Sequence, residues 1–232
     1  MIAAVSSLVE YLVLALIFGA IVIVGVWQSL RQSRKFQRRI FDLRALAERL
    51  SFEDFNPKRD ERFAVGWGFL ECLNRGKDRY ASNILRGTYP DEKLFVFDYH
   101  FQTGEGKNQQ EHHWTFLMLI FKEVFPRITI APESLRLKIA EAFGVVDDID
   151  FESAEFSRRY CVRSPDKKFA YDICNPQMID YLLANPGLKI EIQGPALLLA
   201  FEPLLPVSQI EMNLQRLIGI RSRLPEYLFA NK

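Results

Sequence analysis

The chain has 232 residues, of which 49% are hydrophobic and 25% charged, so its composition is that of a globular protein and excludes a disordered one. Its 30 basic and 29 acidic residues leave a net charge of +1, which excludes the basic excess expected of a nucleic-acid-binding protein. Cys72, Cys161 and Cys174 have neither metal nor redox spacing. They argue against a disulfide framework and favour a reducing compartment.

The N-terminal region contains an apolar run over residues 11–27, bracketed by Tyr11 and Trp27. With Leu8 and Val9 before Glu10, the run reaches the length that a helix needs to cross a hydrocarbon core of roughly 30 Å, and aromatic rings are common at membrane interfaces. A cleaved signal peptide fits less well because residues 1–10 carry no Lys or Arg. The sequence therefore predicts a short extracytoplasmic tail at residues 1–10 and a transmembrane helix at residues 11–27.

Basic residues after the apolar run determine the predicted orientation. None precedes the run, and the cluster that follows it consists of Arg31, Arg34, Lys35, Arg38 and Arg39. Positive residues remain on the cytoplasmic side, so we predict a single-pass protein of the cytoplasmic membrane with its N-terminus outside and its C-terminal domain inside. The same cluster could bind anionic lipid head groups, at about 1 kcal/mol per basic residue.

Residues 28–50 contain neither Pro nor Gly and are predicted to continue the helix as a basic, amphipathic, membrane-proximal segment. Its apolar side chains recur at helical spacing and form a stripe of Phe36, Ile40, Leu43, Ala47 and Leu50. The stripe favours packing against the chain's own domain. Homo-oligomerisation through it is the alternative, although a convincing coiled-coil seam is longer.

Residues 51–232 are predicted to form one cytoplasmic α+β domain with a mainly antiparallel sheet and flanking helices. A helix is expected at residues 60–73, with Asp60 as its N-cap, after the break at Asn56-Pro57. Expected strands cover residues 82–89, 93–102, 111–121 and 127–131, the first two joined as a hairpin. These short connections favour antiparallel pairing.

The second half of this domain is predicted to be richer in helices. Helical segments are expected at residues 132–143, 166–174, 176–184 and about 207–223, with extended pieces at 149–151 and 160–163. Residues 188–193 and 196–201 read as a last hairpin around Gly194-Pro195. Strands followed by helices favour the α+β class over a doubly wound α/β sheet.

Two segments resemble a known group of proteins. One is the string LFVFDYH at residues 94–100 followed by GEGKN at 104–108, and the other is DIDFE at 148–152 followed by EFS at 155–157 and Tyr160. They are similar to an uncharacterised bacterial family with one N-terminal span and a cytoplasmic domain of unknown function. The resemblance covers roughly residues 43–217. It implies a bacterial inner-membrane protein and brings no established activity with it.

The three histidines, His100, His112 and His113, all flank one predicted hairpin loop. Asp98 shares the strand face of His100, and His112 could lie opposite His100, so a His-His-carboxylate site for a metal or a general base is geometrically open. However, His112 and His113 would point to opposite faces of a regular strand. The alternative is a set of polar surface residues near a loop.

Two other tracts lack the residues that their motifs require. The acidic run at residues 147–152 has neither the Gly nor the terminal Glu of an EF-hand loop, so we predict a solvated turn there. The GEGK tract at residues 104–107 lacks the spacing and the Ser or Thr of a P-loop. We therefore predict no catalytic residues, no metal and no cofactor.

The leading hypothesis is a membrane-tethered interaction or regulatory module with an unknown protein partner, and an enzyme is the less favoured class. One alternative is a metal-assisted hydrolase built on Asp98, His100 and His112. Another is an anionic-lipid surface sensor that uses the basic cluster at residues 31–39. The expected partners are thus a lipid bilayer and a protein, without nucleic acid.

Overall fold

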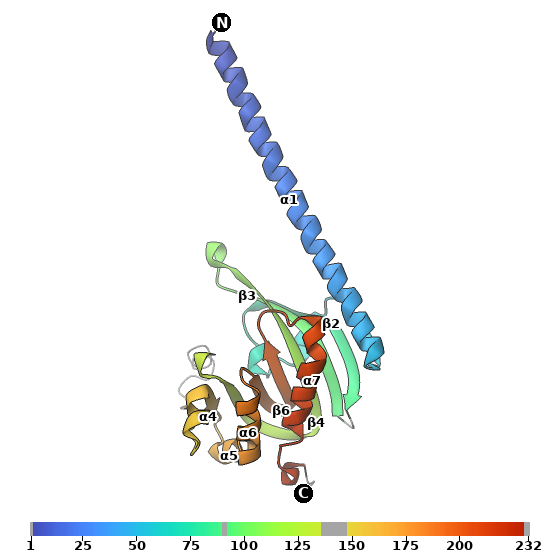
Figure 1. Ribbon diagram of the computed structural model, residues 1–232, viewed down its shortest axis with the longest axis vertical. Coiled ribbons are helices and arrows are strands. Elements are labelled where there is room, and N and C mark those ends of the chain that lie inside the picture. Colours follow the sequence, from blue (N-terminus) through green and yellow to red (C-terminus); the bar gives the residue numbers. More distant parts are fainter. Residues whose placement is uncertain (1, 90–91, 136–147, 230–232) are drawn as a thin grey trace. The chain divides into compact units, whose positions relative to one another are not determined.

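The structure is a computed structural model that describes residues 2–89, 92–135 and 148–229 (Figure 1). In the first helix, the side chains described are those of residues 18–20, 22–27, 30, 31 and 33–49. The chain divides into two compact units, Met1–Ala45 and Leu46–Lys232. The first unit is helical, and the second holds the sheet with the shorter helices.

Helix α1 (Ile2–Arg49) runs without a break through the segment predicted to span a membrane. Within the part of the chain that the structure describes, no helix combines the length and the apolar character needed to cross a bilayer. The predicted transmembrane helix at residues 11–27 is therefore wrong, and so is single-pass localisation in a bacterial inner membrane.

The second unit contains a six-stranded antiparallel sheet, which confirms the predicted α+β class. Its strands are β1 (Asp54–Asn56), β2 (Lys77–Tyr89), β3 (Glu92–Thr103), β4 (Gln110–Pro132), β5 (Tyr160–Arg163) and β6 (Lys189–Phe201). They follow the order β1-β2-β3-β4-β5, and β6 also pairs with β4. The long strand β4 thus organises the sheet, with β3 and β5 along one edge and β6 along the other.

The predicted hairpin of β2 and β3 is confirmed, whereas the predicted hairpin within residues 188–201 is wrong. Strand β6 is continuous and pairs with β4 on both sides of Gly194, where the register shifts. Gly194 adopts a φ of +57°, a conformation that glycine reaches without steric cost, so it accommodates a bulge rather than a chain reversal. Similarly, the two strands predicted at residues 111–121 and 127–131 form one strand, β4.

Short helices and 3₁₀ turns flank the sheet. They are α2 (Glu61–Gly66), η1 (Glu71–Leu73), η2 (Gly106–Asn108), η3 (Glu133–Leu135), α4 (Ala154–Arg159), α5 (Lys167–Ile173), α6 (Pro176–Ala184), α7 (Val207–Arg221) and η4 (Glu226–Leu228). Asp60 accepts a hydrogen bond from Phe63 N as the predicted N-cap, but α2 ends at Gly66 rather than at residue 73. Most of the helix predicted at residues 132–143 lies outside the described residues.

The sheet buries side chains on both faces. One face carries an aromatic core that includes Phe97, Tyr99, Trp114 and Phe116. The opposite face carries Leu117 and other aliphatic residues of β4, and helix α7 packs against this strand (Figure 1). Burying one such side chain stabilises the fold by about 1.5–3 kcal/mol. The alternation along β3 and β4 therefore decides which polar side chain reaches which face.

Candidate functional site

The pairing register of β3 and β4 places the three histidines on two different faces of the sheet. His100 lies directly opposite His113, and Phe101 lies opposite His112. Because successive strand residues alternate between faces, His100 and His113 share one face and His112 lies on the other. The structure thus pairs His100 with His113 rather than with His112.

His112 packs next to the aromatic core. Its ring stacks on Phe101 at a centroid distance of 4.6 Å, and its Nε2 lies 2.8 Å from Thr103 Oγ1. Its Nδ1 lies 3.7 Å from Glu202 Oε1, which ties the start of β4 to the segment after β6. These contacts give His112 a role in joining elements of the domain.

Asp98 is buried and serves as an acceptor within the sheet. Its two carboxylate oxygens accept hydrogen bonds from Asn83 Nδ2 and from Thr115 Oγ1, each at 2.9 Å. The Thr115 hydroxyl in turn accepts from Leu205 N at 3.0 Å. Asp98 therefore links β2, β3 and β4 to the chain beyond β6, which gives it a structural role away from any open site.

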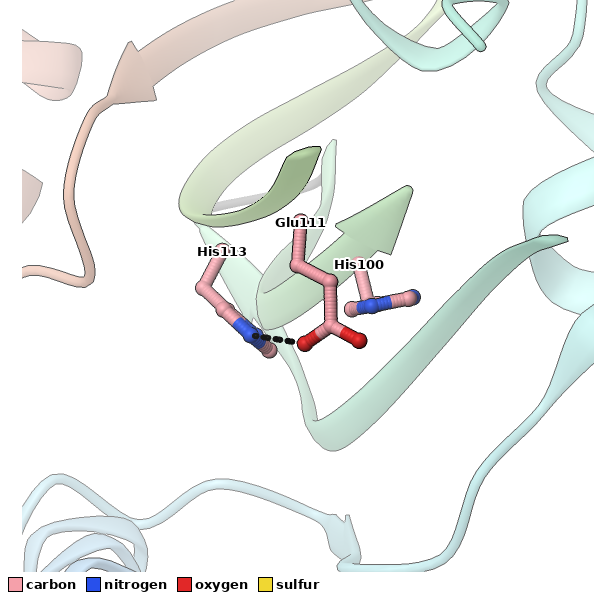
Figure 2. Close-up of side chains that lie close together, drawn as sticks. All are labelled: His100, Glu111 and His113. Atoms are coloured by element: carbon pink, nitrogen blue, oxygen red, sulfur yellow. Dashed lines mark ion pairs between the residues drawn. The ribbon is translucent and has the colours of Figure 1, made fainter. Parts of the chain in front are cut away.

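Two groups of side chains among the described residues have the composition of a metal site. Figure 2 shows the first, in which His100, Glu111 and His113 converge. The second combines Glu133, Asp148 and Cys161. Burial raises the pKa of the Cys161 thiol to about 11, so the sulfur stays protonated and is a poor ligand.

Asp148 already has a structural partner in that second group. Its Oδ1 accepts hydrogen bonds from Val162 N of β5 at 2.8 Å and from Ile149 N at 3.1 Å. The described part of the predicted acidic run therefore holds the chain against β5, while Asp147 lies outside the described residues. We regard the first group as the stronger metal candidate.

A pocket of about 410 Å³ opens on the aromatic face of the sheet. Trp114, Arg75 and Lys189 line it together with Gln209 and residues 200–206, a segment that is apolar except for Glu202. Trp114 is 4% exposed, and its indole N–H has no hydrogen-bond partner in the described structure. The pocket therefore combines an apolar wall with a buried donor, which is the usual composition of a small-molecule site.

Two cations lie near the Trp114 ring. Lys189 Nζ is 4.5 Å from the ring centroid and Arg75 Cζ is 5.8 Å from it, within cation–π range. Arg75 also forms an ion pair with Glu71. Lys189 is 8% exposed, and the structure records no ion pair for its ammonium among the described residues. Lys189 is therefore the cation that this pocket offers most directly to an anion.

A buried carboxylate supports the backbone beside the pocket. Glu191 accepts hydrogen bonds from Glu71 N at 2.6 Å and from Cys72 N at 3.0 Å. Burial raises the pKa of the Glu191 carboxyl, and it also raises the pKa of the neighbouring Cys72 thiol. Cys72 is therefore an inert core residue, and Glu191 fixes the turn that carries Arg75.

The sequence pattern contained a weak signal for this pocket. Lys189 and Glu191 alternate with Leu188, Ile190 and Ile192, so both charged side chains share one face of a predicted strand. Charges on a face that is otherwise core are rare and point to a functional or structural role. Trp114 gave no such signal, because an aromatic residue in a strand is usually part of the core.

The residues predicted at a membrane interface lie on the first unit. Arg31, Arg34, Lys35 and Arg38 are exposed, and the Arg31 guanidinium lies 5.2 Å from the Trp27 ring. Arg39 is half-buried, and the side chain of Tyr11 is outside the described ones. Their contact with a membrane stays a prediction. So does self-association through the stripe of Phe36, Ile40, Leu43, Ala47 and Leu50, which straddles the two units.

Comparison with known proteins identifies the fold but no family. No protein-family model matches the chain, and no curated protein matches it. A similar solved structure is that of the mycobacterial trehalose monomycolate transport factor A, TtfA, with 16% sequence identity and a TM-score of 0.55. The match covers 80% of this chain and 96% of that chain. The two proteins therefore share a fold, and the predicted resemblance to an uncharacterised bacterial family stays a prediction.

Proposed function

We propose that this chain is an interaction module that binds the anionic head group of an amphiphile in the Trp114 pocket. The observation that carries the proposal is Lys189, a lysine that is 8% exposed and whose ammonium lies 4.5 Å from the Trp114 ring in a mostly apolar pocket. A buried cation is costly unless an opposite charge or a polar partner compensates it. An anionic ligand oxygen would provide that compensation.

The lining of the pocket suggests how such a ligand would bind. An anionic oxygen would accept hydrogen bonds from the Lys189 ammonium and from the unpartnered Trp114 indole N–H. The first carbons of its chain would contact Phe201, Leu204 and Pro203. A volume of about 410 Å³ lies within the range for small-ligand sites, so it suits a head group with a short apolar segment rather than a whole lipid.

The structural comparison supports an amphiphile as the ligand class, whereas the anionic head group is inferred from Lys189 and Trp114 alone. TtfA, which shares the fold, is described as a trehalose monomycolate transport factor. A fold used in such transport makes an amphiphile the first ligand class to test for this chain. The proposed activity is binding and presentation, without a chemical step.

Neither alternative from the sequence has comparable support. The hydrolase needs Asp98, His100 and His112 in one site, but His112 lies on the other strand face and Asp98 binds Asn83 and Thr115. The lipid-surface sensor depends on the exposed basic cluster at residues 31–39 and requires a bilayer rather than a single molecule. This requirement provides a way to distinguish it from the pocket.

The test uses the fluorescence of Trp114 in the full chain. The other two tryptophans are replaced as Trp27→Phe and Trp67→Phe, and the protein is titrated with decyl phosphate or decyl maltoside below their micelle concentrations. We expect a saturable change with decyl phosphate and weaker binding of the neutral maltoside. Lys189→Met should weaken phosphate binding at least about tenfold, because a charge-assisted hydrogen bond contributes about 1.5–3 kcal/mol.

Lys122→Met is the matched control, because Lys122 is an exposed lysine of β4 outside the pocket. It should bind decyl phosphate like the parent. Equal binding by Lys189→Met and the parent would contradict the proposal. So would binding only to anionic vesicles that is lost when Arg31 and Arg34 are neutralised, since that result would favour the surface sensor.

A further inference from the structure

We infer that His100, Glu111 and His113 form a binding site for a transition-metal dication such as Zn²⁺. The site lies at the end of the β3–β4 ladder, on the face opposite the Trp114 pocket, and it is independent of the proposed amphiphile binding. His100 and His113 are directly opposed, and Glu111 lies two residues before His113 on the same face of β4. Figure 2 shows their side chains converging.

The surroundings of His100 fix which ring nitrogen can bind a metal. His100 is 7% exposed, and its Nδ1 lies 3.2 Å from the carbonyl oxygen of Asp78. A carbonyl only accepts, so Nδ1 carries the hydrogen and Nε2 keeps the lone pair. A hydrogen bond from the ring nitrogen that does not bind the metal to a carbonyl oxygen is the usual way in which proteins orient a metal-binding histidine.

The backbone and the neighbouring rings hold that orientation. Asp78 adopts a φ of +52° at a register shift between Lys77 and Tyr80, and this bulge directs its carbonyl at His100. Tyr80 stacks on the His100 ring at a centroid distance of 4.6 Å, and the Arg59 guanidinium covers Tyr80 at 4.2 Å. His100 is therefore preorganised before any ligand binds.

His113 and Glu111 supply the exposed half of the site. His113 Nε2 lies 3.7 Å from Glu111 Oε2, and the His100 and His113 ring centroids are 5.0 Å apart. One donor atom from each of the three residues can be chosen so that all lie within 4.8 Å of one another. Tetrahedral Zn²⁺ requires about 3.3 Å between donor atoms, so these distances must shorten by up to about 1.5 Å.

That contraction is accessible because two of the three side chains are free to rotate. His113 and Glu111 have side chains that are 49% and 61% exposed, whereas His100 stays in place.

The donor set selects the class of metal. Two imidazoles and one carboxylate suit Zn²⁺, Co²⁺, Ni²⁺ or Cu²⁺, whereas Ca²⁺ and Mg²⁺ prefer oxygen ligands alone. Three protein ligands leave one tetrahedral position for water or an external ligand. The metal would also join β3 to β4 beside their connecting loop.

The test is a Zn²⁺ titration of the full, metal-free chain in competition with a chromophoric chelator. We expect one saturable site per chain. Glu111→Gln and His113→Gln should each weaken it at least about tenfold, since losing even outer-shell partners costs 10–100-fold. Both side chains are about half exposed, so these variants should fold even if substitution of buried His100 does not.

His112→Gln is the matched control, because His112 neighbours His113 and lies on the other face. It should bind Zn²⁺ as the parent does, and so should Lys189→Met, which separates this inference from the amphiphile proposal. Absence of a saturable site, or an equal loss in His112→Gln and His113→Gln, would overturn the inference. Replacing Zn²⁺ by Co²⁺ should give the strong visible absorption of a tetrahedral site, and a weak octahedral spectrum would also contradict it.

Discussion

Replacing Asp98 by Ala is expected to lower the free energy of unfolding by about 2–4 kcal/mol. Asp98 is buried and accepts hydrogen bonds from Asn83 Nδ2 and Thr115 Oγ1, so the substitution leaves two buried donors without an acceptor. Each orphaned donor costs about 1–3 kcal/mol, and the carboxylate that no longer has to be buried offsets part of that cost. Asn83 also loses the partner that holds it at a φ of +51°.

Urea denaturation followed by circular dichroism measures this change, and an unchanged m-value would indicate a comparable unfolding transition. Thr115→Val and the double variant complete a cycle, in which Asp98 and Thr115 should show a coupling energy of about 0.5–3 kcal/mol. A loss below about 1 kcal/mol would refute the structural role of Asp98. A gain in stability would instead indicate that Asp98 destabilises the fold and has a functional role.

Three further outcomes follow from the described contacts. Gly76→Ala should destabilise the domain more than Gly106→Ala in thermal melts: both have positive φ, but only at Gly76 would a Cβ meet a backbone oxygen, 2.1 Å away on Gln102. Phe116→Ala should cost about 3–5 kcal/mol in urea unfolding, because Phe116 is fully buried in the aromatic core. Glu191→Gln should change how stability depends on pH. Burial raises the folded-state pKa of Glu191 above its ordinary value of 4.5, so the free energy of unfolding should fall as the pH rises from about 4.5 through that raised pKa. The Gln variant has no titrating group at this position and should lack this fall when unfolding is measured between pH 5 and 8.

Local sequence patterns correctly predicted those elements whose formation depends on residues within or next to the element itself. The β2–β3 hairpin and the helices α5 and α6 follow from turn residues, N-caps and a Pro at the first helical turn. The hairpin predicted around Gly194-Pro195 is wrong because a Gly at positive φ is compatible with both a β-bulge and a chain reversal. Only pairing of both halves of β6 with β4 distinguishes them.

The candidate sites could be predicted only in part. Strict alternation along a strand predicted that His112 and His113 point apart. Which of them shares a face with His100 depends on the pairing register of β3 and β4, because a shift of one residue would exchange their faces. Local sequence does not encode that register. Lys189 and Trp114 come from different strands, so their proximity has no local signature.

By itself, the sequence determined the α+β class, the helical N-terminal segment and the three histidines and Asp98 as candidates for chemistry. These properties depend on composition and on periodicity within one element. Tertiary structure decided which side chains meet: His100 with His113 and Glu111, Asp98 with Asn83 and Thr115, and Lys189 with Trp114. The physical reason is that strand register and sheet order bring distant residues together, and both are set by burial across the whole domain.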